Sequence, residues 1–252
     1  EARDHIVYAM YNSGPNYLAS ENNTFTFNVA KNESAINVIV DNVQVGQRAV
    51  VYVNVTAADP NSKAIPQGNV TITVVGDKQY TINLHDADGY ATGSVTLDEL
   101  LANDYRVYAT YDSDSNYNPS TDNDNMFSVL KNQSQVIITV SDDVRVGQNA
   151  TVSVVVKSLE SHANAAIPKG TVTISIDGKE YTIDLSDDVA NNQAIGSKTI
   201  HVLTAGPWVV GATYNSGPNY NGNSSSKEFI VNKNESRVLV EVESIQVGQG
   251  AK

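Results

Sequence analysis

The feature that most constrains this chain is an internal repeat of about 101 residues. The motif K-N-E/Q-S occurs at residues 31–34, 131–134 and 233–236, so the lysine spacings are 131 − 31 = 100 and 233 − 131 = 102. The motif V-G-Q follows it in each case, and its glycines stand 147 − 46 = 101 and 248 − 147 = 101 residues apart. This period is too long for a solenoid unit and suits a whole small domain.

The repeat predicts four parts in the 252-residue chain. Residues 31–130 and 131–232 are complete copies. Residues 1–30 correspond to the last two strands of a preceding copy, and residues 233–252 correspond to the first strand of a following one. We therefore expect a slice of a longer array.

Apolar residues alternate within each copy. In residues 36–40, 136–140 and 238–242 every second residue is Val or Ile, while the residues between them vary in character. One buried face of a strand produces this pattern. The same pattern places further strands at 51–55, 70–74, 80–84, 90–97, 105–111 and 126–130, with turn residues between them.

Seven short strands without a convincing helix predict an all-β chain of tandem seven-stranded Ig-like Greek-key β-sandwiches. The segment L-D-E-L-L-A-N-D at 97–104 is expected to be a turn. The positions expected to be buried are Ile36, Val53, Ile72 and Val107, with their counterparts Val136, Val154, Ile174 and Val210.

Several motifs together resemble a known family. The motifs are P-x-G-x-V-T-I at 66–72, V-x-A-T-Y at 107–111, F-x-V-x-K at 127–131, and V-G-Q. They resemble the group 3 bacterial Ig-like domains, and the resemblance covers essentially the whole chain. It implies a module of very large adhesin-like surface proteins, notably those of methanogenic archaea, and hence an extracellular place at the cell surface.

Composition excludes several classes of protein. The net charge of −12 argues against nucleic acid and anionic lipid as partners. With no cysteine, disulfides and thiolate metal sites are ruled out, and no apolar run is long enough to insert into a membrane. The histidines occupy unrelated repeat positions without a recurring acid or hydroxyl partner, so we expect no enzyme; they are His5, His85, His162 and His201.

One heptapeptide recurs with a change in the middle copy. Residues 11–17 and 214–220 read Y-N-S-G-P-N-Y, whereas residues 111–117 read Y-D-S-D-S-N-Y. The first tyrosine continues the inward series of a strand, so its hydroxyl can bond a neighbouring turn, as in the tyrosine corner of Ig sandwiches. A sugar-stacking platform is the alternative. Trp208 stands in the same inward series and is expected in the core.

The acidic copy of the loop suggests a metal site. In an Ig-type sandwich this loop lies at the end that faces the preceding domain, near the linker around Lys31. Carboxylates that converge there would repel one another without a cation, and ligands that are all oxygen favour Ca²⁺. The candidate ligands are Asp112, Asp114, Asp122 and Asp124. The alternative is a solvated acidic loop that aids solubility, with no cofactor at all.

The linkers carry two further candidate modifications. Cysteine-free surface arrays sometimes contain Lys–Asn or Lys–Asp isopeptide bonds, and the candidate lysines are Lys31, Lys131 and Lys233. The alternative is a solvated linker lysine. An N-x-S sequon follows each lysine, so glycosylation is a hypothesis for Asn32, Asn132 and Asn234.

These observations favour a non-enzymatic extracellular stalk built of tandem Ig-like repeats in an adhesin-like protein. Each copy would add about 35–45 Å of length through its extended strands. Its partners would be neighbouring repeats, and in addition other copies of itself or surface glycans and proteins. Two alternatives stay open: a segment of a self-assembling filament, sheath or surface layer, and a glycan-binding module of a wall-active enzyme.

Overall fold

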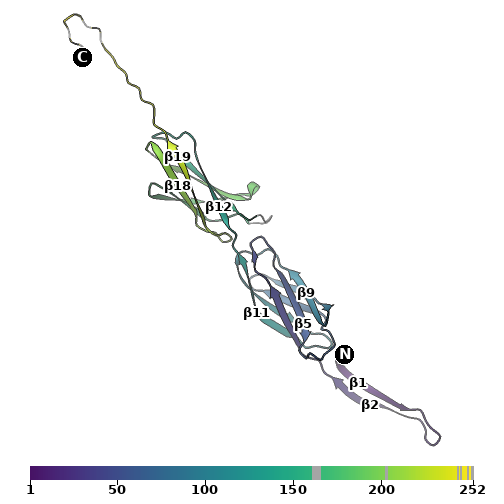
Figure 1. Cartoon of the computed structure of the whole chain (residues 1–252). Helices are drawn as coiled ribbons and strands as arrows, with labels where there is room; N and C mark the ends of the chain where they lie inside the picture. Colours follow the sequence, from purple (N-terminus) through teal and green to yellow (C-terminus); the bar gives the residue numbers. More distant parts are fainter. Residues whose placement is uncertain (161–165, 202–203, 243, 245, 249, 251–252) are drawn as a thin grey trace. The chain divides into compact units, whose positions relative to one another are not determined.

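The computed structural model describes residues 1–160, 166–201, 204–242, 244, 246–248 and 250 (Figure 1). The chain divides into two compact units, one formed by Glu1–Asn132 with Glu160–Ala166 and the other by Gln133–Leu159 with Ile167–Lys252. Each unit contains one β-sandwich, and we describe each by itself.

The first sandwich packs a four-stranded sheet against a five-stranded sheet. The four-stranded sheet has the order β3 (Ser34–Val40), β5 (Val50–Ala57), β9 (Tyr90–Thr96) and β8 (His85–Ala87). The five-stranded sheet has the order β4 (Val43–Gln44), β11 (Ser120–Leu130), β10 (Asn103–Tyr111), β6 (Asn69–Val74) and β7 (Gln79–Asn83).

The V-G-Q region carries the chain from one sheet to the other. β3 pairs antiparallel with β5, and two residues later β4 pairs parallel with the end of β11, where Val43 lies opposite Val129. Gly46 then turns the chain at φ 88°, a conformation that glycine adopts without steric cost. A first strand shared between two sheets, with sequential hairpins around it, is an Ig-like arrangement.

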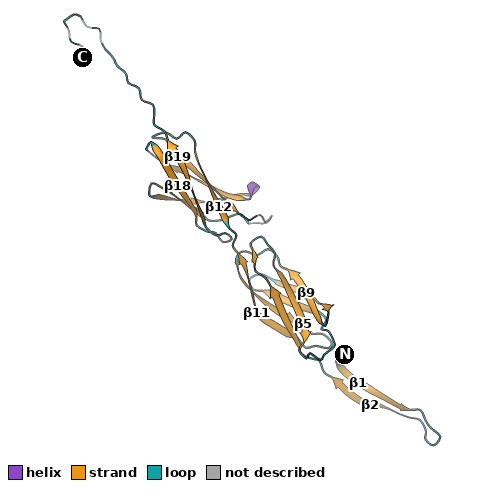
Figure 2. Ribbon diagram, viewed as in Figure 1, coloured by secondary structure: helices purple, strands orange, loops and turns teal. Residues whose placement is uncertain are grey.

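The second sandwich repeats this order. One four-stranded sheet has the order β12 (Ser134–Val140), β13 (Ala150–Ser158), β17 (Gln193–Ile200) and β16 (Ser186–Asp188). The other four-stranded sheet has the order β15 (Lys179–Asp184), β14 (Thr171–Ile176), β18 (Gly206–Tyr214) and β19 (Asn223–Val231). A short 3₁₀ turn, η1 (Val189–Asn191), precedes β17, and no α-helix occurs in the described residues (Figure 2). The all-β sandwich fold predicted from the sequence is confirmed.

Each sandwich has its own hydrophobic core, built from the alternating residues that the sequence pattern identified. The predicted core residues are buried in both copies, except Ile36, which is half-buried and packs against the first core. Trp208 likewise packs half-buried against the second core, and its indole Nε1 donates to the carbonyl of Thr204.

The strand bounds differ from the prediction in two respects. The sequence pattern does not predict the short strands β4 and β8, since two or three residues carry no recognisable period. β11 begins at Ser120 and not near 126, because its polar first half pairs with β10 through the backbone.

Residues 1–30, predicted as the last two strands of a preceding copy, form a two-stranded hairpin, β1 (Arg3–Tyr11) with β2 (Ser20–Val29). Residues 233–242, the predicted first strand of a following copy, are not in a strand, and Val238 and Val240 are exposed.

Candidate functional site

The loop between β10 and β11, residues 112–119, lies against the linker that precedes its own sandwich. The Asn32 N–H donates to the Asn116 carbonyl at 2.8 Å, and the Asn118 N–H donates to the Asn32 carbonyl at 2.8 Å. The Lys31 Nζ donates to the Asp114 carbonyl. The predicted position of this loop beside the Lys31 linker is confirmed.

The tyrosines of the loop are part of the core. The Tyr111 hydroxyl donates to the Gln67 carbonyl at 2.9 Å, and the Tyr214 hydroxyl donates to the Lys169 carbonyl at 2.7 Å. Tyr117 and Tyr220 are fully buried in the two sandwiches. Rings without exposed faces cannot stack on a sugar, so the tyrosine-corner interpretation is right for both complete copies.

Burial changes the acidity of these hydroxyls. Desolvation, followed by the charge of neighbouring Tyr220, raises the pKa of Tyr214 to about 12. Desolvation also raises the pKa of Tyr111, and the nearby Asp114 carboxylate raises it further. Both tyrosines therefore stay protonated donors at any physiological pH.

Two different residues close the same turn in the two sandwiches. In the second sandwich a Cβ on Gly217 would lie 2.3 Å from the Tyr214 hydroxyl and 2.5 Å from the Lys169 carbonyl, so only glycine fits. In the first sandwich the equivalent residue is Asp114. Its carboxylate accepts from the backbone N–H groups of Gln67, Asn116 and Tyr117, each at 2.7 Å. Asp114 thus caps the turn from within.

The four aspartates do not converge, contrary to the expectation. Asp112 lies 3.4 Å from the Thr71 hydroxyl, and Asp122 sits on β11, where it accepts from the Val38 N–H at 3.2 Å. Across the described residues, no group of three or more His, Cys, Asp or Glu side chains could hold a metal ion. The oxygens of Asp114 are already used by backbone N–H groups. Calcium binding stays a prediction without a ligand cluster behind it.

The linker asparagines hold the V-G-Q turn. The Asn132 Nδ2 donates to the Val45 carbonyl and the Asn234 Nδ2 donates to the Val146 carbonyl, both at 3.0 Å. Each bond ties the end of a sandwich to the crossover of the same sandwich. Residue type alone does not predict this contact, but the joint recurrence of K-N and V-G-Q in the sequence is a signal for it.

These bonds bear on the proposed modifications. A glycan on Asn132 or Asn234 would attach to the same amide nitrogen that donates to the V-G-Q turn. The Asn32 Nδ2 is also engaged, because it donates to the Ser62 hydroxyl at 3.2 Å. Lys31, Lys131 and Lys233 are all exposed, whereas an isopeptide bond needs a lysine beside a buried acid. Glycosylation and isopeptide formation both stay predictions.

The described histidines do not form a catalytic arrangement. His5 stacks on Phe27, His85 is exposed, and His201 bonds the side chain of Asn149. His162 lies outside the described residues. None of the described helical segments is long and apolar enough to cross a membrane.

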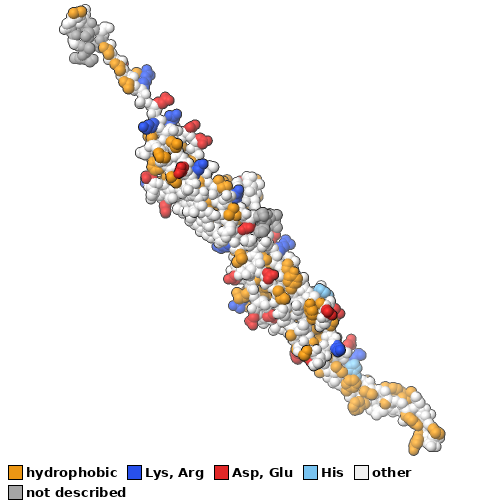
Figure 3. All heavy atoms as spheres, in the orientation of Figure 1, with side chains coloured by type: hydrophobic (Ala, Val, Ile, Leu, Met, Phe, Trp, Pro, Cys, Tyr) orange, Lys and Arg blue, Asp and Glu red, His pale blue; other side chains and the backbone are white. Residues whose placement is uncertain are grey.

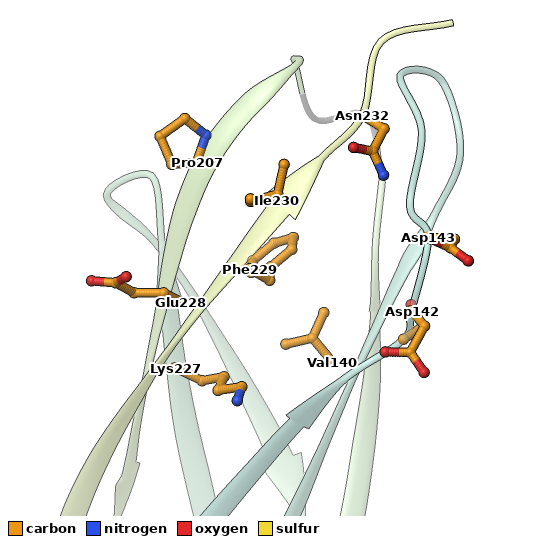
Figure 4. Close-up of a pocket in the computed structure, with 10 residues that line it drawn as sticks. Val140, Asp142, Asp143, Pro207, Lys227, Glu228, Phe229, Ile230 and Asn232 are labelled. Atoms are coloured by element: carbon orange, nitrogen blue, oxygen red, sulfur yellow. The ribbon is translucent and has the colours of Figure 1, made fainter.

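A half-open groove of about 580 Å³ lies at the edge of the second sandwich, between the end of β12 and β19 (Figure 4). Val140 and Phe229 line its interior, with Asp142 and Lys227 among its polar residues. In the first sandwich the corresponding edge is bridged, because the Ser128 N–H donates to the side chain of Asn42 at 2.7 Å. The second copy has one extra residue before V-G-Q and carries no such bridge among its described residues.

Comparisons with known proteins agree with this fold. Residues 38–129 match the family model described as Bacterial Ig-like domain (group 3). No curated protein matches the chain by sequence.

Several solved structures resemble the chain at low identity. The adhesin InvE of Yersinia pseudotuberculosis is 15% identical with a TM-score of 0.39, over 79% of this chain and 58% of its own. The fibronectin(III)-like modules of Clostridium thermocellum CbhA are 10% identical with a TM-score of 0.32, over 82% of this chain and 100% of theirs. The Escherichia coli adhesin FdeC is 13% identical with a TM-score of 0.30, over 83% of this chain and 68% of its own. Likenesses this distant carry no argument about function.

The family match covers β4 to β10 completely, and it includes the crossover, the tyrosine corner and most of β11. The resemblance found in the motifs is therefore confirmed for this part of the chain: residues 38–129 are a group 3 bacterial Ig-like domain.

Proposed function

We propose that this chain is a non-enzymatic segment of an extracellular, adhesin-like surface protein, in which successive Ig-like sandwiches form a stalk. The observation that carries the proposal is the direct succession of two complete sandwiches. β11 ends at Leu130 and β12 begins at Ser134, which leaves three residues between them. Almost all residues of the repeat therefore belong to a folded sandwich, and very few belong to a flexible linker.

The contacts at the sandwich ends support this proposal. Asn132 and Asn234 each fix the residue that leaves a sandwich, and Lys31 and Asn32 bond the loop of the sandwich they enter. Such contacts serve a protein that carries load or holds a distal region away from a surface. Among the described residues, no group of three or more His, Cys, Asp or Glu side chains could hold a catalytic metal ion.

Solution scattering on a lengthened chain tests the stalk. A second copy of residues 31–232 is inserted after residue 232, so that two sandwiches become four. Because each sandwich contributes about 40 Å through its strands, we expect the maximum dimension to grow by about 80 Å. A lengthened chain whose maximum dimension grows by less than half of this would contradict a stalk.

Immunogold labelling of intact source cells tests the location. Antibodies raised against this chain should label the outer surface of unpermeabilised cells. Label confined to permeabilised cells would exclude an extracellular role. Uniform helical fibres formed by the purified chain would favour the filament alternative, and retention on wall polysaccharide would favour the glycan-binding alternative.

A further inference from the structure

In the first sandwich, the corner between β7 and the end of β9 is closed by a network of charged and polar side chains. The Lys78 Nζ forms an ion pair with Asp98 and lies 5.1 Å from the centroid of the Tyr80 ring. The Tyr80 hydroxyl donates to the Asp77 carboxylate at 2.6 Å and accepts from the Asp98 N–H at 3.3 Å. The cation and the hydroxyl of this corner therefore have partners within the sandwich.

The second sandwich lacks both carboxylates of this corner. The equivalent tyrosine is Tyr181, which lies opposite Ile174 as its counterpart lies opposite the matching isoleucine of β6. The two aspartates are replaced by Gly178 and His201. Tyr181 and Lys179 make no side-chain hydrogen bond or ion pair with the described residues. The donors are retained in the second copy, and their acceptors are gone.

The second sandwich also has an additional lysine at this corner. Lys198 lies opposite Val152 on β13, just as Val95 lies opposite Val51 on β5. Val95 is half-buried and packs against the first core, so the position faces inward. Lys198 is exposed and makes no ion pair within the part of the chain that the structure describes. Core packing does not explain a lysine at this position.

A shallow hollow of about 530 Å³ lies at this corner. Five residues line it: Tyr181, Ser197, Lys198, Thr199 and His201. The pairing of β16 with β17 ends at Ile195, so the rest of this edge of β17 has no partner among the described strands. Alternate residues of such an edge present their backbone N–H groups outward. The hollow thus combines an ammonium group, a phenol hydroxyl and strand-edge N–H groups, all of which are hydrogen-bond donors.

The charge of this corner differs from that of the protein as a whole. The chain has a net charge of −12, and acidic and basic side chains are interspersed over both sandwiches on the face that Figure 3 shows. Glu180 alternates with Lys179 and Tyr181 along β15, so it projects from the opposite face of the strand. Asp187 is paired with Lys169. The two lysines of the corner therefore have no carboxylate that neutralises them.

We infer that this corner of the second sandwich binds an oxyanion group, a sulfate or a carboxylate, beside Lys198 and Tyr181. A set of donors without acceptors recognises such a group, because each of its oxygens accepts hydrogen bonds and its charge is attracted to the ammonium group. The group is either a free ion or part of an acidic sugar, whose ring would pack on the half-buried Tyr181 ring. The inference does not depend on the proposed stalk.

Titration of the isotope-labelled full chain, followed by amide NMR shifts, tests the inference. The titrants are sodium sulfate, sodium glucuronate and, at matched ionic strength, sodium chloride. We expect sulfate and glucuronate to shift residues 179–181 and 197–201 with a Kd below about 10 mM, and the equivalent residues 78–80 and 94–98 to stay unshifted. Tighter binding of glucuronate than of sulfate would assign an acidic sugar, and the reverse order would assign a free ion. Absent shifts, or equal shifts with chloride, would overturn the inference.

Three variants locate the site. Lys198→Val introduces the residue of the first sandwich and should weaken binding about fivefold, the effect of losing one ion pair near the surface. His201→Asp restores a carboxylate that can pair with Lys179, so it should weaken binding as well. Lys227→Val removes an exposed lysine of β19 outside the corner and should leave the Kd unchanged. Dispersed amide spectra verify that each variant is folded. Equal losses in Lys198→Val and Lys227→Val, or full binding by His201→Asp, would contradict a site at this corner.

Discussion

Removing one hydroxyl from Tyr214 tests the tyrosine corner most directly. The ring is 1% exposed at the end of β18, and its hydroxyl donates to the Lys169 carbonyl at 2.7 Å. Tyr214→Phe keeps the ring and deletes only this bond. A net intramolecular hydrogen bond contributes about 1 kcal/mol, and an acceptor left dry costs up to about 3 kcal/mol. Because Lys169 is exposed, water can reach its carbonyl, so we expect a loss of about 1–1.5 kcal/mol.

Urea unfolding followed by tryptophan fluorescence measures this loss. Trp208 is the only tryptophan in the chain and packs against the second core, so its signal reports this sandwich alone. With a urea slope of about 1 kcal/mol per M for a domain of this size, the midpoint should fall by about 1 M. Tyr111→Phe is the matched control: it removes the same bond from the first sandwich and should leave the Trp208 transition unchanged.

Alkaline pH provides an independent check on the same hydroxyl. Its pKa is about 12 in the folded protein and about 10 when the chain is unfolded. The folded state therefore holds a proton that the unfolded state releases. The corresponding stability is present below pH 10 and is lost as the pH rises from 10 to 12. Tyr214→Phe should flatten this decline. An unchanged urea midpoint together with an unchanged alkaline decline would refute the hydroxyl's role.

Three further substitutions test the other structural contacts. Asp114→Ala removes the acceptor of three backbone N–H groups and should destabilise the first sandwich by about 2–3 kcal/mol in calorimetry, whereas replacing residues 112–115 with the N-S-G-P of the flanking copies should cost less than half as much. Equal losses would contradict the capping role. Asn234→Ala should speed hydrogen exchange at residues 144–148, since it frees the Val146 carbonyl. Unchanged exchange at these residues would contradict a stabilising role for the bond between Asn234 and Val146. Val53→Ala, at a fully buried site, should cost about 2–4 kcal/mol, and a cost below about 1 kcal/mol would mean that Val53 is not in a close-packed core.

The fold could be predicted from the sequence because two signals agree in it. Alternation such as that of Val51, Val53 and Val55 identifies a strand and its buried face, and the repeat allows each strand to be checked against its copy. Alternation does not identify a strand that has no buried face of its own. The first half of β11, from Ser120 to Asp124, is polar because it borders solvent, and its pairing with β10 depends on backbone groups that leave no trace in residue type.

The candidate site was harder to predict for a related reason. Four carboxylates within thirteen residues suggest a cluster, but side chains that are close along the chain need not converge on one site in the fold. Asp114 turns inward to the backbone of its own loop, whereas Asp122 reaches across to β3. A carboxylate that accepts backbone N–H groups is satisfied without a cation. The sequon marks the linker asparagines as candidates for glycosylation, whereas only the fold shows that the side chains of Asn132 and Asn234 bond a turn 87 or 88 residues earlier.

The alternation between acidic and glycine-containing loops follows from one geometric requirement. In both sandwiches a buried tyrosine hydroxyl must reach the carbonyl of the residue that precedes a left-handed glycine, Gly68 or Gly170. The loop can make room for this contact by having no side chain, as at Gly217, or it can bring in a side chain that bonds the surrounding N–H groups, as Asp114 does. Both arrangements preserve the corner, since in both the turn closes through the same backbone bond, from Gly217 to Tyr220 and from Asp114 to Tyr117. Part of the acidic character of the middle loop is thus a consequence of how its turn is built, and it needs no ligand to explain it.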